Sequence, residues 1–283
     1  MRFGASTFIW ASPFSDENVG PLAAKAAELG FDVLEICLED PALVTVDAVR
    51  SAAADAGVEI SVCGAFGPDR DVSHEDPEVR RGAAEYLRTC IDIAAAIGSE
   101  NVSGPMYSAT GKTRLLPDEE RARQWDRAVE GLAAAGDYAA ERGVGLAIEP
   151  LNRYETDLVN TNEQAIRLCR DIGRDNVGLL IDTFHMNIEE KDIGAAIREA
   201  GSFVRNFHAC ENDRGTPGGG HVEWEAVAAA LSEIEYDGLV VIESFTPEIK
   251  EIARAVSLWR PVAPSSDALA ADGIGFLKRL LRS

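Results

Sequence analysis

The sequence predicts an α/β protein that folds as a single closed (β/α)8 TIM barrel over residues 1–283. Short apolar runs rich in β-branched residues alternate with alanine-rich stretches of helical periodicity, and this alternation occurs eight times. Strands that alternate with helices form parallel sheets. Eight such units in 283 residues, with no linker or low-complexity segment, fit a closed barrel better than an open doubly wound sheet.

Most of the predicted strands are short apolar segments that follow a glycine or a polar residue. Residues 144–149 read VGLAIE, and residues 177–182 read VGLLID. Runs of this length suit buried strands of a parallel sheet. The predicted strands span residues 3–8, 32–37, 58–63, 100–104, 144–149, 177–182, 203–208 and 239–243.

The helices are predicted from their periodicity and from their end signals. Thr161 with Gln164 forms a capping box, and Asp76 precedes Pro77 at a helix start. Glycines stand just after three predicted helices, at positions 30, 57 and 98, where a left-handed residue is favoured. The predicted helices span residues 18–30, 46–56, 77–97, 118–142, 161–173, 192–200, 223–235 and 265–281. Residues 247–264 form a long insertion that we expect to be ordered and to pack near the barrel mouth.

Composition excludes several classes of function. The net charge of −21 opposes binding to DNA or RNA. The apolar runs are much shorter than the ~20 residues of a membrane span, and the N-terminus lacks the apolar core of a signal peptide. The five cysteines are odd in number and contain no CxxC, which argues against a disulfide framework or a structural zinc site. We therefore expect a cytoplasmic protein with no nucleic-acid or membrane partner.

The last four predicted strands end in residues that commonly bind metals. Glu149, Asp182, His208 and Glu243 each end one strand, and each follows the previous one by a single βα unit. The carboxyl ends of barrel strands open on one face, where active sites gather. Three carboxylates in one mouth would repel each other unless a cation joined them. Three oxygen ligands and one imidazole suit Mn²⁺, Co²⁺ or Mg²⁺ better than a structural zinc.

Three more polar residues follow the ligand-bearing strands. Glu155 comes after Glu149, His185 lies in DTFHMN after Asp182, and Arg214 follows His208. A carboxylate, an imidazole and a guanidinium near a metal offer both donors and acceptors to a small polyhydroxylated substrate. Each residue alone would be read as a surface residue, but their shared placement favours a role in binding.

These motifs resemble the ketose 3-epimerases, the D-tagatose 3-epimerase / D-psicose (D-allulose) 3-epimerase family of the xylose isomerase-like TIM barrel superfamily. The resemblance covers nearly the whole chain, and its most specific stretches are EPLNRYE and IDTFHMNIEE. The other matching stretches are LGFDVLEI (29–36), DPEVRRGA (76–83), NTNEQA (160–165), FHACENDR (207–214), PGGG with Trp224 (217–224) and VVIESF (240–245).

The resemblance implies roles for the residues singled out above. It implies a small ketose substrate, one divalent metal ion, most often Mn²⁺ with Mg²⁺ or Co²⁺ as alternatives, and a homodimer or homotetramer. Glu149 and Glu243 would exchange a proton on opposite faces of C3 through a cis-enediolate held on the metal. The implied metal ligands are Glu149, Asp182, His208 and Glu243, and the implied substrate contacts are Glu155, His185 and Arg214.

The departures from relatives lie in the loops expected to touch the sugar. Ser6 and Thr110 stand where relatives carry aromatic residues. The candidates for an apolar wall are Phe8, Trp10, Phe66 and Tyr107, with Met106 beside them. Three interpretations therefore stay open. The first is a ketose 3-epimerase. The second is a related isomerase or epimerase whose substrate is a sugar, an inosose or a hydroxypyruvate-type compound, and the third is a barrel that binds sugar without catalysis.

Overall fold

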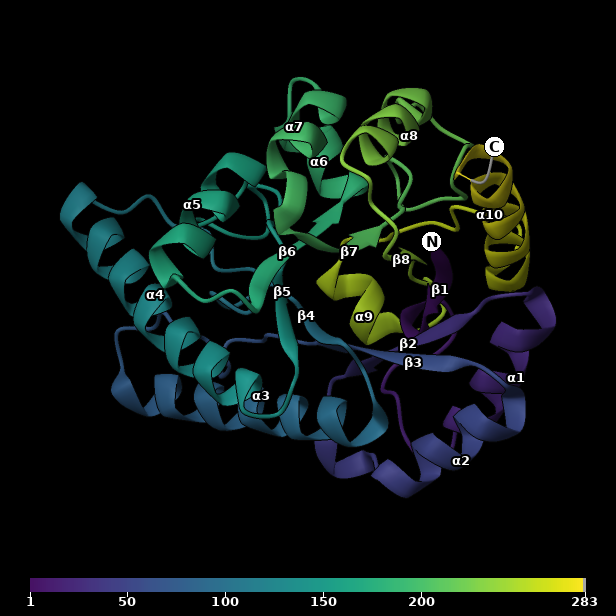
Figure 1. Ribbon diagram of the computed structural model, residues 1–283, viewed down its shortest axis with the longest axis horizontal. Helices are drawn as coiled ribbons and strands as arrows, with labels where there is room; N and C mark the ends of the chain where they lie inside the picture. The colour runs from purple at the N-terminus through teal and green to yellow at the C-terminus, as the bar shows by residue number, and fades with distance from the viewer. Residues whose placement is uncertain (282–283) are drawn as a thin grey trace.

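The protein forms a closed barrel of parallel strands joined in chain order, which confirms the predicted fold class (Figure 1). The computed structural model describes residues 1–281. Each strand pairs with the next along the chain, and β1 pairs with β8 to close the barrel. The strands are β1 (Arg2–Ser6), β2 (Val33–Leu38), β3 (Glu59–Gly64), β4 (Asn101–Gly104), β5 (Gly145–Ile148), β6 (Val177–Asp182), β7 (Val204–His208) and β8 (Leu239–Ile242).

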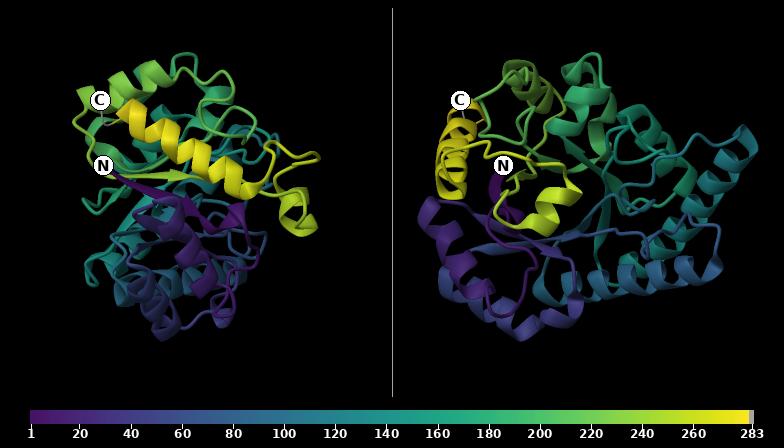
Figure 2. Two further views of the ribbon diagram at one scale, coloured as in Figure 1. Left: turned by 90° about the vertical axis from the view of Figure 1, so that its right-hand side faces the viewer. Right: turned by 180° about the vertical axis from the view of Figure 1, so that it is seen from behind.

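Helices surround the barrel, and the main hydrophobic core lies between them and the strands (Figure 1, Figure 2). The small helix α9 stands out from the barrel body in the left view of Figure 2. The α-helices are α1 (Val19–Leu29), α2 (Val46–Ala56), α3 (Pro77–Ile97), α4 (Asp118–Ala140), α5 (Asn162–Ile172), α6 (Thr183–Glu189), α7 (Ile193–Ala200), α8 (Trp224–Glu233), α9 (Lys250–Ala255) and α10 (Ser266–Leu281). Short 3-10 turns are η1 (Thr7–Ile9), η2 (Pro41–Leu43) and η3 (Gly201–Phe203).

The predicted elements lie within two residues of the observed ones at each end. Thr161 and Gln164 form the capping box, and Asp76 caps α3 by accepting from the N–H of Glu78. The three glycines predicted to follow helices have left-handed φ values of 87°, 71° and 83°. Local capping chemistry therefore sets most of the helix boundaries.

Two helices, α6 and α9, have no counterpart among the predicted elements. Helix α6 starts directly from β6, because the Asp182 carboxylate accepts the N–H of Phe184 at 2.7 Å and so caps the helix. The sequence there has no glycine or proline to announce a change from strand to helix. Strand β1 likewise ends earlier than predicted, since Ser6 caps the turn η1 by accepting from the N–H of Phe8.

The centre of the barrel is polar beneath the strand ends that matter for function. Asn206 Nδ2 donates to Glu35 Oε2 at 3.1 Å and to Ser103 Oγ at 3.0 Å. Ser61 Oγ donates to the same oxygen of Glu35 at 3.3 Å. The interior of such barrels is commonly filled with branched apolar side chains. A buried polar layer at this level therefore points to a site directly above it.

The ladder between β6 and β7 contains one irregularity. Leu179 pairs with Val204, whereas the next residue, Leu180, pairs with Asn206, so that Arg205 is skipped. An extra residue in one strand moves every later side chain of that strand to the opposite face. The bulge therefore decides which residues of β7 point into the barrel.

This bulge places His208 beside Asp182 at the barrel mouth. The two residues are paired across the strands, whereas without the extra residue Phe207 would stand opposite Asp182. Gly178 leaves room for the bulge, because a Cβ atom there would collide with the carbonyl oxygen of Phe203. The glycine thus belongs to the architecture that aligns two candidate ligands.

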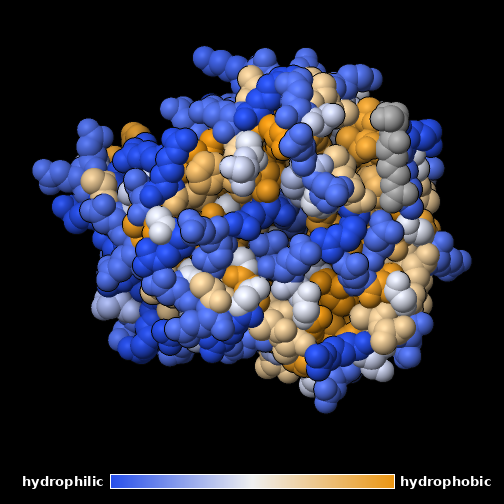
Figure 3. All heavy atoms as spheres, viewed as in Figure 1, coloured by the Kyte–Doolittle hydropathy of each residue, from blue (hydrophilic) through white to orange (hydrophobic). Residues whose placement is uncertain are grey.

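The outer surface agrees with the acidic composition. The face seen in Figure 3 is largely hydrophilic, and hydrophobic residues appear on it in smaller patches. Among residues 1–281, none of the helices is both apolar enough and long enough to cross a membrane.

We expect Gly178→Ala to lower the free energy of unfolding by about 1–3 kcal/mol, because the added methyl group overpacks the bulge. Urea unfolding followed by circular dichroism measures the change. Gly20→Ala on α1 is the control, since a Cβ atom there meets open space. It should raise stability by up to about 1 kcal/mol through helix propensity. Equal stability of Gly178→Ala and the wild type would contradict this role.

Candidate metal centre and active site

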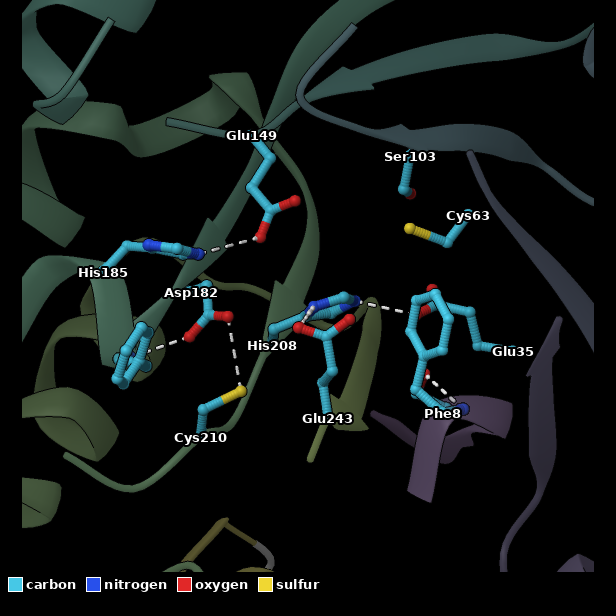
Figure 4. A network of polar contacts seen from close by, with 12 residues as sticks. Phe8, Glu35, Cys63, Ser103, Glu149, Asp182, His185, His208, Cys210 and Glu243 are labelled. Carbon is cyan, nitrogen blue, oxygen red and sulfur yellow. Dashed lines mark hydrogen bonds and ion pairs between the residues drawn. The ribbon is translucent and has the colours of Figure 1, made fainter. Parts of the chain in front are cut away.

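Four residues from consecutive strands meet at the barrel mouth. Asp182 and His208 end β6 and β7, while Glu149 and Glu243 directly follow β5 and β8. Each offers one ligand atom, and these atoms lie within 4.8 Å of one another. Figure 4 shows the three carboxylates and the imidazole turned toward a common centre. The structure thus brings together the four predicted ligands, and the group could hold a metal ion.

The pKa values of the two glutamates shift in opposite directions, although both side chains are buried. Burial, followed by the nearby charge of Glu243, raises the pKa of Glu149 well above its usual value. Burial also acts to raise the pKa of Glu243, but Arg214 and His208 outweigh it and lower that pKa. The two carboxyl groups therefore differ in how readily each holds a proton. Such a pair of unlike carboxyl groups is typical of sites that move protons.

Arg214 supplies the positive charge closest to the carboxylates. Its Nη1 donates to Asp182 Oδ2 at 2.6 Å and to Glu243 Oε2 at 3.0 Å. The guanidinium lies over the ring of Phe184, with Cζ 4.1 Å from the ring centroid. The backbone of Arg214 has a φ of 63°, which is uncommon for a residue other than glycine. The loop therefore adopts a costly conformation that holds this side chain in the site.

His208 is held from below by the polar layer of the barrel. Its Nε2 lies 2.8 Å from Glu35 Oε1, although the two atoms are not aligned as in a linear hydrogen bond. The other ring nitrogen, Nδ1, is buried and has no hydrogen-bond partner within residues 1–281. It faces the carboxylates, with Glu243 Oε2 3.6 Å away. A buried ring nitrogen without a hydrogen-bond partner, beside three carboxylates, fits a divalent cation, and a carboxylate behind the histidine is common at metal sites.

The three predicted substrate contacts also reach this centre. Glu155, His185 and Arg214 line one large cavity of about 1130 Å³ together with Glu149 and Glu243. Burial raises the pKa of Glu155. Burial, helped by the charge of Arg214, lowers the pKa of His185 well below its usual value, so its imidazole is neutral.

The apolar wall agrees only in part with the sequence prediction. Phe8 and Phe66 line the cavity, and so does Thr110. Trp10 and Tyr107 lie outside its described lining. The indole N–H of Trp10 donates to Asp267 on α10, and the hydroxyl group of Tyr107 donates to the Val159 carbonyl beneath the loop after β5. Both side chains support the framework, because their polar atoms already have partners there.

Ser6 also differs from its expected place in a sugar-contacting loop. It is fully buried under η1, and its Oγ lies 3.4 Å from Cys37 Sγ. Phe8, and not Ser6, reaches the cavity from this turn.

Several lining residues were missed by sequence reasoning. Phe184 stands two residues beyond Asp182, Phe245 stands two residues beyond Glu243, and both line the cavity. The pattern of a ligand followed at the second position by phenylalanine could have identified them. Leu258 and Trp259 enter from the insertion near α9, which confirms that this segment is ordered beside the mouth. Trp259 keeps 73% of its surface exposed, so it forms the outer rim.

Glu35 could also have been found from the sequence. It is a carboxylate in the middle of an otherwise apolar predicted strand, DVLEIC, and it is fully buried in the structure. A charge in that position needs a partner, because burying an isolated carboxylate is very costly. The partner, His208, lies on β7 and cannot be inferred from spacing along the chain.

Comparison with known proteins places the chain in a family. The sequence model described as xylose isomerase-like TIM barrel matches residues 23–280. The chain is 33% identical to a ketose 3-epimerase of Arthrobacter globiformis, an alignment that covers 98% of this chain and 96% of the relative. It is 31% identical to a D-psicose 3-epimerase of Agrobacterium fabrum, over 96% and 94% of the two chains.

A solved structure shows the same architecture. The D-allulose 3-epimerase from Methylomonas sp. in complex with D-allulose superposes with a TM-score of 0.93 at 30% identity, covering 99% of this chain and 97% of that chain. These similarities agree with the barrel topology and with the buried acidic cluster, and they identify the protein family. The chain belongs to the ketose 3-epimerases of the xylose isomerase-like TIM barrel family and is a carbohydrate epimerase.

Proposed function

We propose that this protein inverts C3 of a free ketose of the D-fructose/D-psicose, D-tagatose/D-sorbose or L-ribulose type. One observation carries the proposal: Glu149 and Glu243 face the same buried centre from β5 and β8, which are not neighbours in the barrel. A substrate carbon between them has a carboxyl group on each face. Inversion requires a proton to leave one face and another to return on the opposite face, which a pair of opposed bases performs.

The roles of the two glutamates follow from this geometry. The proton at C3 is acidic because it lies α to the C2 carbonyl. The charged glutamate takes this proton, and the protonated one delivers its own to the other face. In the reverse reaction the two exchange roles. The opposite pKa directions of Glu149 and Glu243 support one proton shared unequally between them.

We propose Glu149, Asp182, His208 and Glu243 as the ligands of one divalent cation. Oxygen ligands with one imidazole fit Mn²⁺ best, with Mg²⁺ or Co²⁺ as alternatives. When bound, such an ion supplies positive charge that stabilises the negative charge developing on the substrate oxygens. Buried Arg214 adds a fixed positive charge beside the same carboxylates.

The surrounding cavity fits a small polyhydroxylated ligand. Glu155 offers an acceptor, while His185 and Arg214 offer donors, in the same cavity as Glu149. The rings of Phe8 and Phe66 form apolar surface that can contact the C–H faces of a sugar. Exposed Trp259 stands at the entrance.

The first test follows the proton at C3. With Mn²⁺ in D₂O, D-psicose or D-fructose should gain deuterium at C3 and convert into its epimer, as measured by NMR and chromatography. Formation of an aldose instead of the C3 epimer would favour an isomerase of the same family. Absence of exchange with all of the ketoses named above would refute the proposal.

Replacing one base at a time sharpens this test. Glu149→Gln and Glu243→Gln should each lower epimerisation by about 10²- to 10⁴-fold, since each removes one proton-transfer group. Each variant should still exchange deuterium from one epimer only, and the two variants should prefer opposite epimers. Bound Mn²⁺ is quantified in parallel, because both residues are also proposed ligands. Loss of exchange from both epimers in variants that retain metal would contradict the two-base scheme.

Metal removal provides the second test. Chelation should abolish epimerisation, and Mn²⁺ should restore it. Mn²⁺ at one hundred times its dissociation constant should stabilise the fold by about 2.7 kcal/mol, which thermal unfolding detects. His208→Ala should lose this stabilisation. His221→Ala, an exposed histidine, should keep it. The same metal response in both variants would exclude His208 as a ligand.

The third test concerns the carboxylate behind His208. Glu35→Gln should weaken Mn²⁺ binding by about tenfold, because the ring loses the charged group that orients it. Isothermal titration calorimetry measures this change without substrate. Glu59→Gln, an exposed acid that pairs with Arg2 near the start of β3, is the matched control and should bind Mn²⁺ normally. Unchanged affinity in Glu35→Gln would show that packing alone orients His208.

A further inference from the structure

We propose that Asn152 is a positioning residue that fixes the tautomer of His185 and the orientation of Glu155. Its effect is that His185 presents an Nε2–H donor, and Glu155 a free carboxylate oxygen, to the oxygens of the substrate. That the ligand is a ketose rests on the proposed function, whereas the hydrogen-bonding pattern rests on the geometry alone.

Asn152 lies at the junction of the two residues. It is 1% exposed and belongs to the loop that follows β5. Its Nδ2 donates to Glu155 Oε1 at 2.8 Å and lies 2.9 Å from His185 Nδ1. Its backbone N–H also points at His185 Nδ1, at 3.1 Å. One buried side chain therefore contacts both predicted substrate-binding groups.

The orientation of the Asn152 amide is determined by a fourth contact. Asn152 Oδ1 accepts the backbone N–H of Tyr154 at 2.9 Å. A backbone N–H can only donate, so this end of the amide must be the oxygen. The Nδ2 group, with its two protons, must then face Glu155 and His185. A flipped amide would place its oxygen against the Glu155 carboxylate and would cost both bonds.

The N–H groups of Asn152 that point at His185 indicate which tautomer its ring adopts. Two N–H groups of Asn152 point at Nδ1, and the backbone one cannot be rotated away. These two donors, one of them fixed in the backbone, favour Nδ1 as the acceptor over Nε2, which faces a single movable donor of Arg214. An imidazolium ion has no acceptor nitrogen and does not fit these contacts. A neutral imidazole with an acceptor at Nδ1 carries its proton on Nε2. Nε2 lies on the side of the acidic centre, 3.7 Å from Glu149 Oε1.

This assignment gives the site a defined pair of donors. Arg214 Nη2 lies 3.1 Å from His185 Nε2, and arginine can only donate. With the proton on Nε2, these two atoms cannot bond to each other, so the movable Arg214 side chain must turn its N–H away from this contact. An oxygen atom with free lone pairs, such as a carbonyl or hydroxyl oxygen, can accept from both. Glu155 complements them, because Asn152 occupies Oε1 and leaves Oε2 to accept from a hydroxyl group.

Asn160, a nearby asparagine, is a control that distinguishes a purely structural role of Asn152 from the proposed positioning role. Asn160 braces the same loop, donating to the carbonyl oxygens of Leu151 at 2.9 Å and of Thr156 at 3.1 Å. These contacts are to the loop backbone and not to His185 or Glu155. Loss of either asparagine should loosen the loop, whereas only changes at Asn152 should alter the ring of His185.

The decisive experiment reads the tautomer directly. Protein labelled with ¹⁵N-histidine is studied by NMR with Mg²⁺ in place of paramagnetic Mn²⁺. The His185 signals are identified by their loss in His185→Gln. We expect a protonated Nε2 and an unprotonated Nδ1 in the wild type. Asn152→Asp places a carboxylate against Nδ1, where it competes with the backbone N–H of the same residue, and should shift the proton toward that nitrogen. Asn160→Asp adds the same charge to the same loop and should leave the tautomer unchanged.

Kinetics with D-psicose add a second readout. Asn152→Ala should raise KM about tenfold, the effect of roughly one lost hydrogen bond, and should change kcat less. Asn160→Ala should not raise KM selectively over kcat. If Asn152→Asp does not fold, the kinetics of Asn152→Ala still test the proposal. A wild-type tautomer with the proton on Nδ1, or equal effects at the two asparagines, would overturn the proposal. If none of the ketoses is turned over, the proposed function fails, and the NMR result still decides the role of Asn152.

Discussion

The burial of three carboxylates beside one another constrains the rest of this molecule. Glu149, Asp182 and Glu243 are each at least 94% buried, and their ligand atoms lie within 4.8 Å of one another. Such a cluster is stable only if positive charge or protons compensate it. Arg214 supplies part of this charge, and the donor set of three carboxylates and His208 fits a divalent cation for the rest. Catalysis and stability therefore depend on the same electrostatic balance.

The barrel meets this constraint through its backbone and its interior. The bulge in β7 sets the register that puts His208 beside Asp182, and Gly178 gives the bulge its space. Below the mouth, Glu35 faces the ring of His208. Polar atoms in a barrel interior are costly unless they are paired, so this layer is best explained as support for the groups above it.

The loop after β5 connects the acidic centre with the binding groups. It begins at Glu149, passes through Asn152 and reaches Glu155, so one short segment carries a proposed base, a proposed positioning residue and a proposed acceptor for the substrate. Tyr107, expected in the cavity wall, instead braces this loop through its hydroxyl group, which also accepts the N–H of Leu151. Rigid support of this kind keeps reacting groups within the narrow range of positions that proton transfer requires.

The sequence by itself determined the barrel, most element boundaries and the four strand-end residues that could hold a metal ion, because these follow from local periodicity, capping chemistry and the shared direction of parallel strands. Only the tertiary structure decided how distant residues meet. It placed Glu35 behind His208, Asn152 between Glu155 and His185, and it moved Trp10 and Tyr107 out of the cavity wall. These outcomes depend on strand register, on a bulge and on competition for hydrogen-bond partners, which residue spacing along the chain does not encode.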